Sequence, residues 1–400
     1  MISQGVTRRM TEKELFCKVI SAAMFPQTHR MPDIPGEQYS VLHERLKSHT
    51  LALLPAALLN SAEMPEALRQ QWQKELFTQK LRFGQYLIHQ EAVLRLFSQA
   101  GIPCVVLKGT VSASYYPEPA YRAMGDIDLL VRPRDCQSAV RLLKENGFRA
   151  SGYRDAIEQG FRKGYVPLEL HIGICPEGQY ADTINTLLLN HFAEMESKEL
   201  YDFVFPCMTE MCNGLVLLEH MHHHLRDHLG FRQVIDWMLY VDAHLDDKAW
   251  NANLRGLFTQ CGLERFAIVI TAMCQRYFGL RTEGISWPQN ADAALCEELF
   301  DHIYVMGNFG NQLEANQKSA AGMLRDRSLL CVLKDLQKVG LDNWALCRSH
   351  PWLRPFAWLY QIFLYLYRII TEGYNMSVLL VIKERRRFRK TMELMKKLGL

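Results

Sequence analysis

Two aspartates alternate with large apolar residues in the segment Met124–Val131, whose sequence is MGDIDLLV. Successive side chains of a β-strand point to opposite faces of a sheet, so Asp126 and Asp128 would share one face. The apolar neighbours predict a strand inside a sheet, although two exposed acids on an edge strand are the alternative. Two carboxylates about 7 Å apart repel each other and do not stabilise a core. A divalent cation would offset that repulsion, because Mg²⁺ favours carboxylate oxygens together with substrate phosphates.

Further strands and a helix are predicted on either side of this acidic strand. The apolar run Cys104–Leu107 is typical of a short buried strand, and a later strand is predicted over 168–174. A helical pattern covers residues 133–146 between them. Strands that are separated by helical patterns predict a mixed α/β sheet at about 102–175.

The remainder of the chain is predicted to be helical. We therefore expect an α+β fold in which a small mixed sheet is flanked by helices, with a helical N-terminal segment and a large helical C-terminal domain. The polar segment Gly307–Gly322 is predicted to be a loop. The expected parts are a helical N-terminal region at 1–100, an α/β core at 101–206, a helical domain at 207–345, and hydrophobic and then basic helices at 346–400.

Composition and charge are those of a folded protein. The 400 residues are 48% hydrophobic and 22% charged, and this length exceeds what one compact core usually holds. Segment 383–400 carries a net charge of +6, whereas the whole chain carries +3, so the rest of the chain is weakly acidic at −3. A long nucleic acid is therefore not expected as a substrate.

Cysteine usage and the first residues predict a cytoplasmic location. The eleven cysteines include no C-x-x-C pair, and Cys207 and Cys212 are too widely spaced for a standard zinc knuckle. This pattern indicates free thiols in a reducing compartment. Segment 1–30 lacks the continuous apolar stretch of a secretory signal.

The most hydrophobic stretch of the chain is 351–370. Arg354 and Arg368 bracket a segment well short of the roughly twenty apolar residues that span a bilayer. Because a basic run follows at 383–390, a peripheral membrane contact through 351–390 is one interpretation. A core-packing helix followed by a solvated basic helix is the interpretation that we favour.

The residues Lys108-Gly109-Thr110 follow the first predicted strand and open a helix. Free backbone N–H groups at a helix start suit an anionic phosphate, to which Lys108 would add charge and Thr110 a hydroxyl. Gly125, just before the acidic strand, would let the backbone or a phosphate come close. A glycine after a strand is more often only a turn, so this interpretation depends on the acidic strand that follows.

A third carboxylate lies in the predicted strand Leu168–Ile172. Glu169 and His171 share one face of that strand, and the leucines and the isoleucine share the other. In an α/β core, such a polar face would bring Glu169 beside the first two carboxylates. A solvent-facing edge strand is the alternative.

Together, these segments resemble the DNA polymerase β-like nucleotidyltransferases. That superfamily carries a Gly-Ser or Gly-Gly turn, then hydrophobic-Asp-hydrophobic-Asp/Glu-hydrophobic, and an acid on a later strand; here Thr110 replaces the Ser or Gly. The combination of VLKG, RxMGDIDLLV and LELH is similar to a largely uncharacterised bacterial branch. In that branch a His-rich helix precedes Gly-x-Arg-x-x-x-Asp, which is Gly230–Asp236 here, and the resemblance covers about 80–245.

The resemblance implies a polymerase β-like core and a metal-dependent transfer of a nucleoside monophosphate from a nucleoside triphosphate to a hydroxyl, with release of pyrophosphate. Asp126, Asp128 and Glu169 would be the catalytic residues and would hold Mg²⁺ or Mn²⁺, and Glu169 would also serve as general base. The nucleotide-binding residues would be Lys108, Gly109, Thr110, Arg122 and Gly125. The acceptor is expected to be a small molecule or a protein.

Two other functions are compatible with the sequence. If the protein had lost its catalytic activity, the fold would serve as a binding, regulatory or toxin–antitoxin module. Against this, all three expected carboxylates are present. His220 and His224, four residues apart on one predicted helix, would suit a metal hydrolase, but the chain has no His-Glu-x-x-His motif. These histidines would otherwise pack in the core or face the nucleotide. Arg232 and Asp236 would pair within their helix.

Overall fold

The computed structural model describes residues 10–154, 157–164, 166–227, 229–308, 346–371 and 389–400, together with residues 336–337, 340–341 and 343–344. The chain forms two compact units, one of residues 1–308 with 398–400 and one of residues 309–397. Every residue of the candidate site belongs to the first unit. The division of that unit into N-terminal helices, an α/β core and a helical domain stays a prediction.

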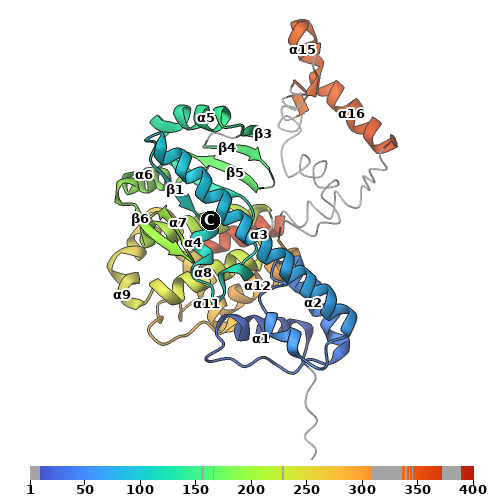
Figure 1. Ribbon diagram of the computed structural model, residues 1–400, viewed down its shortest axis with the longest axis vertical. Coiled ribbons are helices and arrows are strands. Elements are labelled where there is room, and N and C mark those ends of the chain that lie inside the picture. Colours follow the sequence, from blue (N-terminus) through green and yellow to red (C-terminus); the bar gives the residue numbers. More distant parts are fainter. Residues whose placement is uncertain are drawn as a thin grey trace, which may run out of the picture. The chain divides into compact units, whose positions relative to one another are not determined.

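A mixed sheet of seven strands forms the centre of the first unit, in the order β3-β4-β5-β2-β1-β7-β6 (Figure 1). The strand β2 is parallel to β5 and antiparallel to β1, so the acidic segment lies inside the sheet as predicted. The strands are β1 Cys104–Leu107, β2 Ile127–Val131, β3 Arg149–Arg154, β4 Glu158–Lys163, β5 Val166–His171, β6 Glu196–Leu200 and β7 Phe203–Cys207.

Helices account for most of the remaining described residues, which confirms the predicted α+β class. The prediction of helices alone after residue 182 was wrong at β6 and β7, whose antiparallel pair joins the sheet beside β1. In the first unit the α-helices are α1 Glu12–Met24, α2 Tyr39–Ser48, α3 Glu66–Gln99, α4 Gly109–Ala113, α5 Cys136–Glu145, α6 Ala181–Asn190, α7 Glu210–Asp227, α8 Phe231–His244, α9 Asp247–Ala249, α10 Arg255–Gln260, α11 Glu264–Phe278 and α12 Ala293–Met306. Short 3₁₀ or π turns are η1 Gly36–Gln38, η2 Ala56–Asn60, η3 Pro119–Tyr121, η4 Pro133–Asp135, η5 Phe192–Glu194 and η6 Trp250–Leu254.

The two faces of the sheet pack against different helices. One face lies against α3 and α5, where Phe97 and Leu143 pack with Leu129 of β2. Figure 1 shows the long helix α3 running across the sheet. The other face packs against α6 and α7, where Val216 lies with Leu130. Since side chains alternate along β2, Asp128 belongs to the same face as Leu130 and is directed toward α7.

The second unit contains the hydrophobic stretch. It forms α15 Leu346–Ser349, the 3₁₀ turn η8 Pro351–Phe356 and α16 Ala357–Thr371. None of the helices that the structure describes is both long and apolar enough to cross a membrane. Residues 372–388, with most of the basic run, lie outside the described residues, as does most of the loop predicted at 307–322. The predicted membrane contact through 351–390 therefore stays a prediction.

A buried ion pair joins the loop before β2 to helix α8. Arg122 Nε and Nη2 donate to the two carboxylate oxygens of Asp236, at 2.8 and 2.7 Å, and Tyr116 Oη donates to the same carboxylate at 2.7 Å. Asp236 therefore pairs with Arg122. The predicted pair between Asp236 and Arg232, which lies one turn earlier in α8, does not form. Arg232 Nη1 instead donates to the carbonyl oxygen of Ala123 at 2.8 Å. Both arginines therefore hold the loop that leads to Asp126.

Removal of the carboxylate of Asp236 is expected to destabilise the fold strongly. The substitution Asp236→Ala leaves the buried guanidinium of Arg122 without its charge partner, and the free energy of unfolding should fall by about 3–5 kcal/mol. The measurement is urea denaturation followed by circular dichroism. The matched control is Asp242→Ala on the same helix, whose ion pair with Arg281 is partly exposed and should contribute about 0–1 kcal/mol. Equal losses in the two variants would contradict this role of Asp236.

Candidate active site

The predicted catalytic acids come from two neighbouring parallel strands. Asp126 lies one residue before β2, Asp128 lies on β2, and Glu169 lies on β5. Asp128 is the register partner of Glu169, so the two side chains leave the same face of the sheet side by side. Asp128 is 3% exposed, whereas the side chain of Glu169 is 27% exposed and accessible to a substrate.

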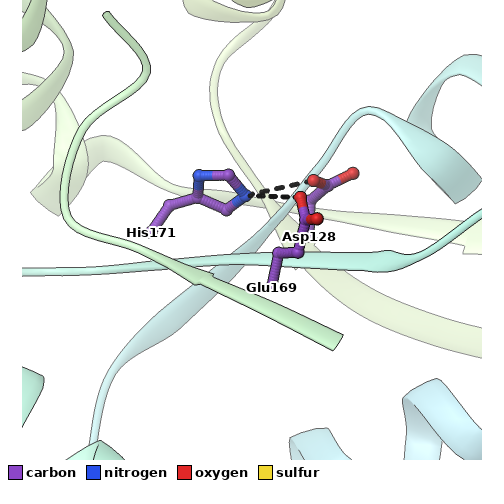
Figure 2. A group of neighbouring side chains, drawn as sticks. All are labelled: Asp128, Glu169 and His171. Carbon is purple, nitrogen blue, oxygen red and sulfur yellow. Dashed lines mark hydrogen bonds and ion pairs between the residues drawn. The ribbon is translucent and has the colours of Figure 1, made fainter. Parts of the chain in front are cut away.

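A histidine completes this group, as Figure 2 shows. His171 Nε2 lies 3.1 Å from Asp128 Oδ1 and 3.7 Å from Glu169 Oε2, and its Nδ1 lies 3.7 Å from Glu158 Oε2. The sequence placed His171 on the face of Glu169 without assigning it to the site. Glu158 was missed because it enters through β4, whose pairing with β5 has no signature in the sequence.

Lys108 places a positive charge directly beside Asp128. Its Nζ lies 2.9 Å from Asp128 Oδ1 and 3.5 Å from His220 Nδ1. The turn that places it is tight, since Lys108 and Gly109 have φ values of 46° and 37°. A Cβ at Gly109 would lie 2.6 Å from Tyr86 Oη. That hydroxyl donates to the carbonyl oxygen of Asp126 at 2.9 Å, so Tyr86 fixes the turn and the acidic strand together.

The two paired acids differ in their proton affinity. Burial alone would raise the pKa of Asp128, but the ammonium of Lys108 and the hydrogen bond with His171 lower it to about 2. Burial and the negative charges of Asp126 and Asp128 raise the pKa of Glu169 to about 10. At neutral pH, Asp128 is therefore ionised and Glu169 is protonated, because the described residues supply too little positive charge for all three acids to ionise.

These residues fit a divalent cation. One ligand atom each from Asp128, Glu169 and His171 lies within 4.8 Å of the others. Carboxylate oxygens suit Mg²⁺ and Mn²⁺, and an imidazole is compatible with Mn²⁺. Asp126 is not a member of this group, although its charge contributes to the raised pKa of Glu169. The structure thus brings together two of the three predicted metal ligands and adds His171.

The predicted phosphate-binding residues differ in whether their side chains lie near the carboxylates or are bound elsewhere. Lys108 and Gly109 lie at the end of β1 beside Asp128. The hydroxyl of Thr110 is buried and donates to Gln90 Oε1 at 2.9 Å, so it is directed toward α3. The guanidinium of Arg122 is occupied by Asp236. Gly125 is exposed, and a Cβ there would meet nothing within 4 Å, so space is open at this point. Nucleotide binding by these five residues stays a prediction.

The histidine cluster of α7 borders the site without forming a metal centre. The rings of His220 and His224 have centroids 4.3 Å apart. Burial and the charge of Lys108 lower the pKa of His220 well below its usual value, so this ring is neutral. In the described part of the chain, Asp128, Glu169 and His171 are the only such group of three metal-ligand side chains, so a histidine-based hydrolase has no assembled site there. His220 instead reaches the candidate active site through Lys108.

The raised pKa of Glu169 predicts a specific dependence of stability on pH. The folded protein keeps a proton on Glu169 that the unfolded chain loses above about pH 4.3, so this contribution to stability is lost as the pH rises toward 10. Because Glu169→Gln cannot lose a proton, it should become increasingly more stable than the metal-free wild type between pH 5 and 9, by up to about 1.4 kcal/mol per pH unit.

The measurement is chemical denaturation at several pH values with a metal chelator present. Glu145→Gln, which changes an exposed acid on α5, is the matched control and should show no such trend. A constant difference between Glu169→Gln and the wild type across the pH range would contradict the assignment.

Comparisons with known proteins agree with the class of enzyme that the sequence predicts. No curated protein matches the chain. One solved structure, of the lincosamide antibiotic adenylyltransferase LnuA with lincomycin bound, matches with 16% identity and a TM-score of 0.28, over 38% of this chain and 94% of that one. This similarity is too low to support a conclusion on fold or function.

A family model described as uncharacterised nucleotidyltransferase matches residues 39–279, which include the whole sheet and every residue of the candidate site. The chain belongs to this family of nucleotidyltransferases.

Proposed function

We propose that the protein transfers a nucleoside monophosphate from a nucleoside triphosphate to a hydroxyl group of a small molecule or a protein, and that it requires Mg²⁺ or Mn²⁺. The observation that supports this most is the register pairing of Asp128 with Glu169, with Lys108 2.9 Å from Asp128. Carboxylates arranged in this way can bind the metal ion that the reaction needs, and the ammonium of the lysine can bind the phosphates.

The carboxylates of Asp126, Asp128 and Glu169, with His171 beside them, would hold the divalent cation. When bound, the cation supplies Lewis-acid stabilisation of the charge that develops on the transferred phosphoryl group and on the leaving oxygen. As a ligand of the cation Glu169 would have to be ionised, since an ionised carboxylate is the form that coordinates.

Lys108 and the turn that follows it would bind the triphosphate. The ammonium is buried against Asp128, and the carboxylates of Asp128 and Asp126 raise its pKa despite the opposing effect of burial, so Lys108 is charged at neutral pH. The first backbone N–H groups of α4, at the buried residues Gly109 and Thr110, precede the hydrogen-bonded turns of the helix and would donate to phosphate oxygens. His220, held neutral beside Lys108, adds no competing charge.

In the transfer, the oxygen of the acceptor hydroxyl forms a bond to the α-phosphorus. The bond from the α-phosphorus to the bridging oxygen breaks, and pyrophosphate leaves with the electron pair. Glu169 would accept the hydroxyl proton, because it is the more exposed of the two paired carboxylates and would be ionised when the cation is bound. The products are the acceptor nucleoside-monophosphate ester and pyrophosphate.

Nucleotide binding should depend on the metal and on the acidic strand. We expect the wild type to bind at least one of ATP, GTP, CTP and UTP when Mg²⁺ or Mn²⁺ is present. The substitutions Asp126→Asn/Asp128→Asn should weaken this binding by about 100-fold or more, because several kcal/mol of charge stabilisation are lost. The measurement is isothermal titration calorimetry, with Asp242→Asn as the control. If the folded wild type binds no nucleotide, a binding or regulatory module without catalysis becomes the better explanation.

Substitution of Lys108 should change metal and nucleotide affinity in opposite directions. Lys108→Met removes a cation 2.9 Å from Asp128, so Mn²⁺ alone should bind about tenfold more tightly or better, while the nucleotide should bind more weakly. Electron paramagnetic resonance of free Mn²⁺ gives the first affinity, and calorimetry gives the second. Lys144→Met, at an exposed position on α5, is the control. Weaker binding of both ligands would show that Lys108 only supports the fold of the site.

A further inference from the structure

A hollow of about 740 Å³ lies over the strands β3, β4 and β5, and Glu169 forms part of its lining. Arg149 of β3 and Arg162 of β4 also line it. Both arginines are exposed, and neither forms an ion pair with an acid that the structure describes. The hollow therefore places two available guanidinium groups beside a predicted catalytic carboxylate.

The strand register puts these groups on the catalytic face of the sheet. Gly160 is the partner of Glu169, Arg162 is the partner of Pro167, and Arg149 is the partner of Arg162. Directly opposed residues of antiparallel strands share a face, so both arginines leave the face from which Glu169 emerges. Because Gly160 has no side chain, β4 places no side chain directly opposite Glu169.

The opposed arginines carry an electrostatic cost. Like charges directly opposite each other on antiparallel strands destabilise a sheet. An oxyanion between them would reverse that effect, since guanidinium groups bind phosphate and carboxylate through paired, charge-assisted hydrogen bonds. The pair Arg149 and Arg162 is thus suited to a ligand with a phosphate or carboxylate group.

The order of strands indicates which substrate carries this anion. Lys108 and Gly109, where the triphosphate would bind, lie at the end of β1 on one side of β2. The arginines lie on β4 and β3, on the other side of β2 and beyond Glu169. In an in-line displacement the attacking and leaving oxygens are on opposite sides of the phosphorus. The hollow is therefore on the side of the attacking acceptor.

We propose that the acceptor is a small hydroxyl compound that carries a phosphate or a carboxylate, and that Arg149 and Arg162 bind this oxyanion while the hydroxyl lies at Glu169. This inference rests on the proposed nucleotidyl transfer. Arg162 and Glu169 are diagonal neighbours, roughly 7–8 Å apart, which is a spacing within one small molecule. The volume of the hollow is in the range of small-molecule sites. The net charge of −3 outside segment 383–400 disfavours nucleic acid as the acceptor.

The first test uses inorganic phosphate and acetate as probes of the hollow. The full-length protein is saturated with Mg²⁺ and the α,β-methylene analogue of its preferred nucleotide, so that the triphosphate site is filled, and each anion is titrated by calorimetry. Arg149→Gln/Arg162→Gln should weaken anion binding by about tenfold or more. Arg95→Gln/Arg141→Gln, which removes two exposed arginines from α3 and α5 on the other face of the sheet, should leave it unchanged.

Each outcome of this titration decides the question. The anion that binds more tightly to the wild type identifies phosphate or carboxylate as the group recognised. If neither anion binds the wild type, or if both bind the two double variants equally, the inference is wrong. If no nucleotide binds, the proposed nucleotidyl transfer is wrong. The titration of phosphate and acetate without nucleotide then still shows whether the two arginines bind an anion. Nucleotide binding by Arg149→Gln/Arg162→Gln verifies that this variant is folded.

The second test identifies the acceptor. The protein is incubated with α-³²P-labelled nucleotide and either a deproteinised small-molecule extract or total RNA. We expect a labelled product from the extract that binds an anion exchanger more strongly than the nucleoside monophosphate, and we expect Arg149→Gln/Arg162→Gln to form at least tenfold less of it. Labelled RNA, or a labelled product without an additional anionic group, would overturn the inference.

Discussion

Repulsion among Asp126, Asp128 and Glu169 is the constraint on which the arrangement of the site depends. Three carboxylates on one face of a largely buried sheet cannot all be ionised without cations, because burial and like charge both favour the protonated form. The structure meets this constraint in two ways. Lys108 and His171 lie against Asp128 and keep it ionised, while Glu169 keeps its proton. A divalent cation that binds here would therefore have to displace the proton of Glu169 and compete with the ammonium of Lys108.

The helices hold this arrangement in place by fixing the loops between the strands. Tyr86 of α3 contacts both the turn at Gly109 and the loop at Asp126. Asp236 of α8 binds Arg122 in the same loop. Side chains on packed helices have few alternative positions, so the acids on β2 and β5 are held more accurately than residues of mobile loops would be. The helices thus contribute to the geometry of the site without supplying its acids.

The local pattern of the sequence predicted the strands β1, β2 and β5 and the faces of their side chains. It predicted neither β3, β4, β6 and β7 nor which strands are neighbours. Asp126, Asp128 and Glu169 could be assigned to polar faces because alternation has a period of two residues. That Asp128 and Glu169 are partners depends on the strand order, which alternation does not encode. Arg122 was expected at a phosphate and binds Asp236, more than a hundred residues further along the chain. Spacing within α8 suggested a different partner for Asp236, and the tertiary contact prevailed over that local preference.

The ion pair between Lys108 and Asp128 also bears on how the protein is made and stored. A site with ionised acids and no cation of its own would need a metal ion before the surrounding strands could pack. Here the lysine of the neighbouring strand end supplies that charge, so the sheet can assemble and persist in an environment poor in free metal. The divalent cation of the proposed transfer would then bind to a sheet that is already folded, and it could arrive together with the nucleotide.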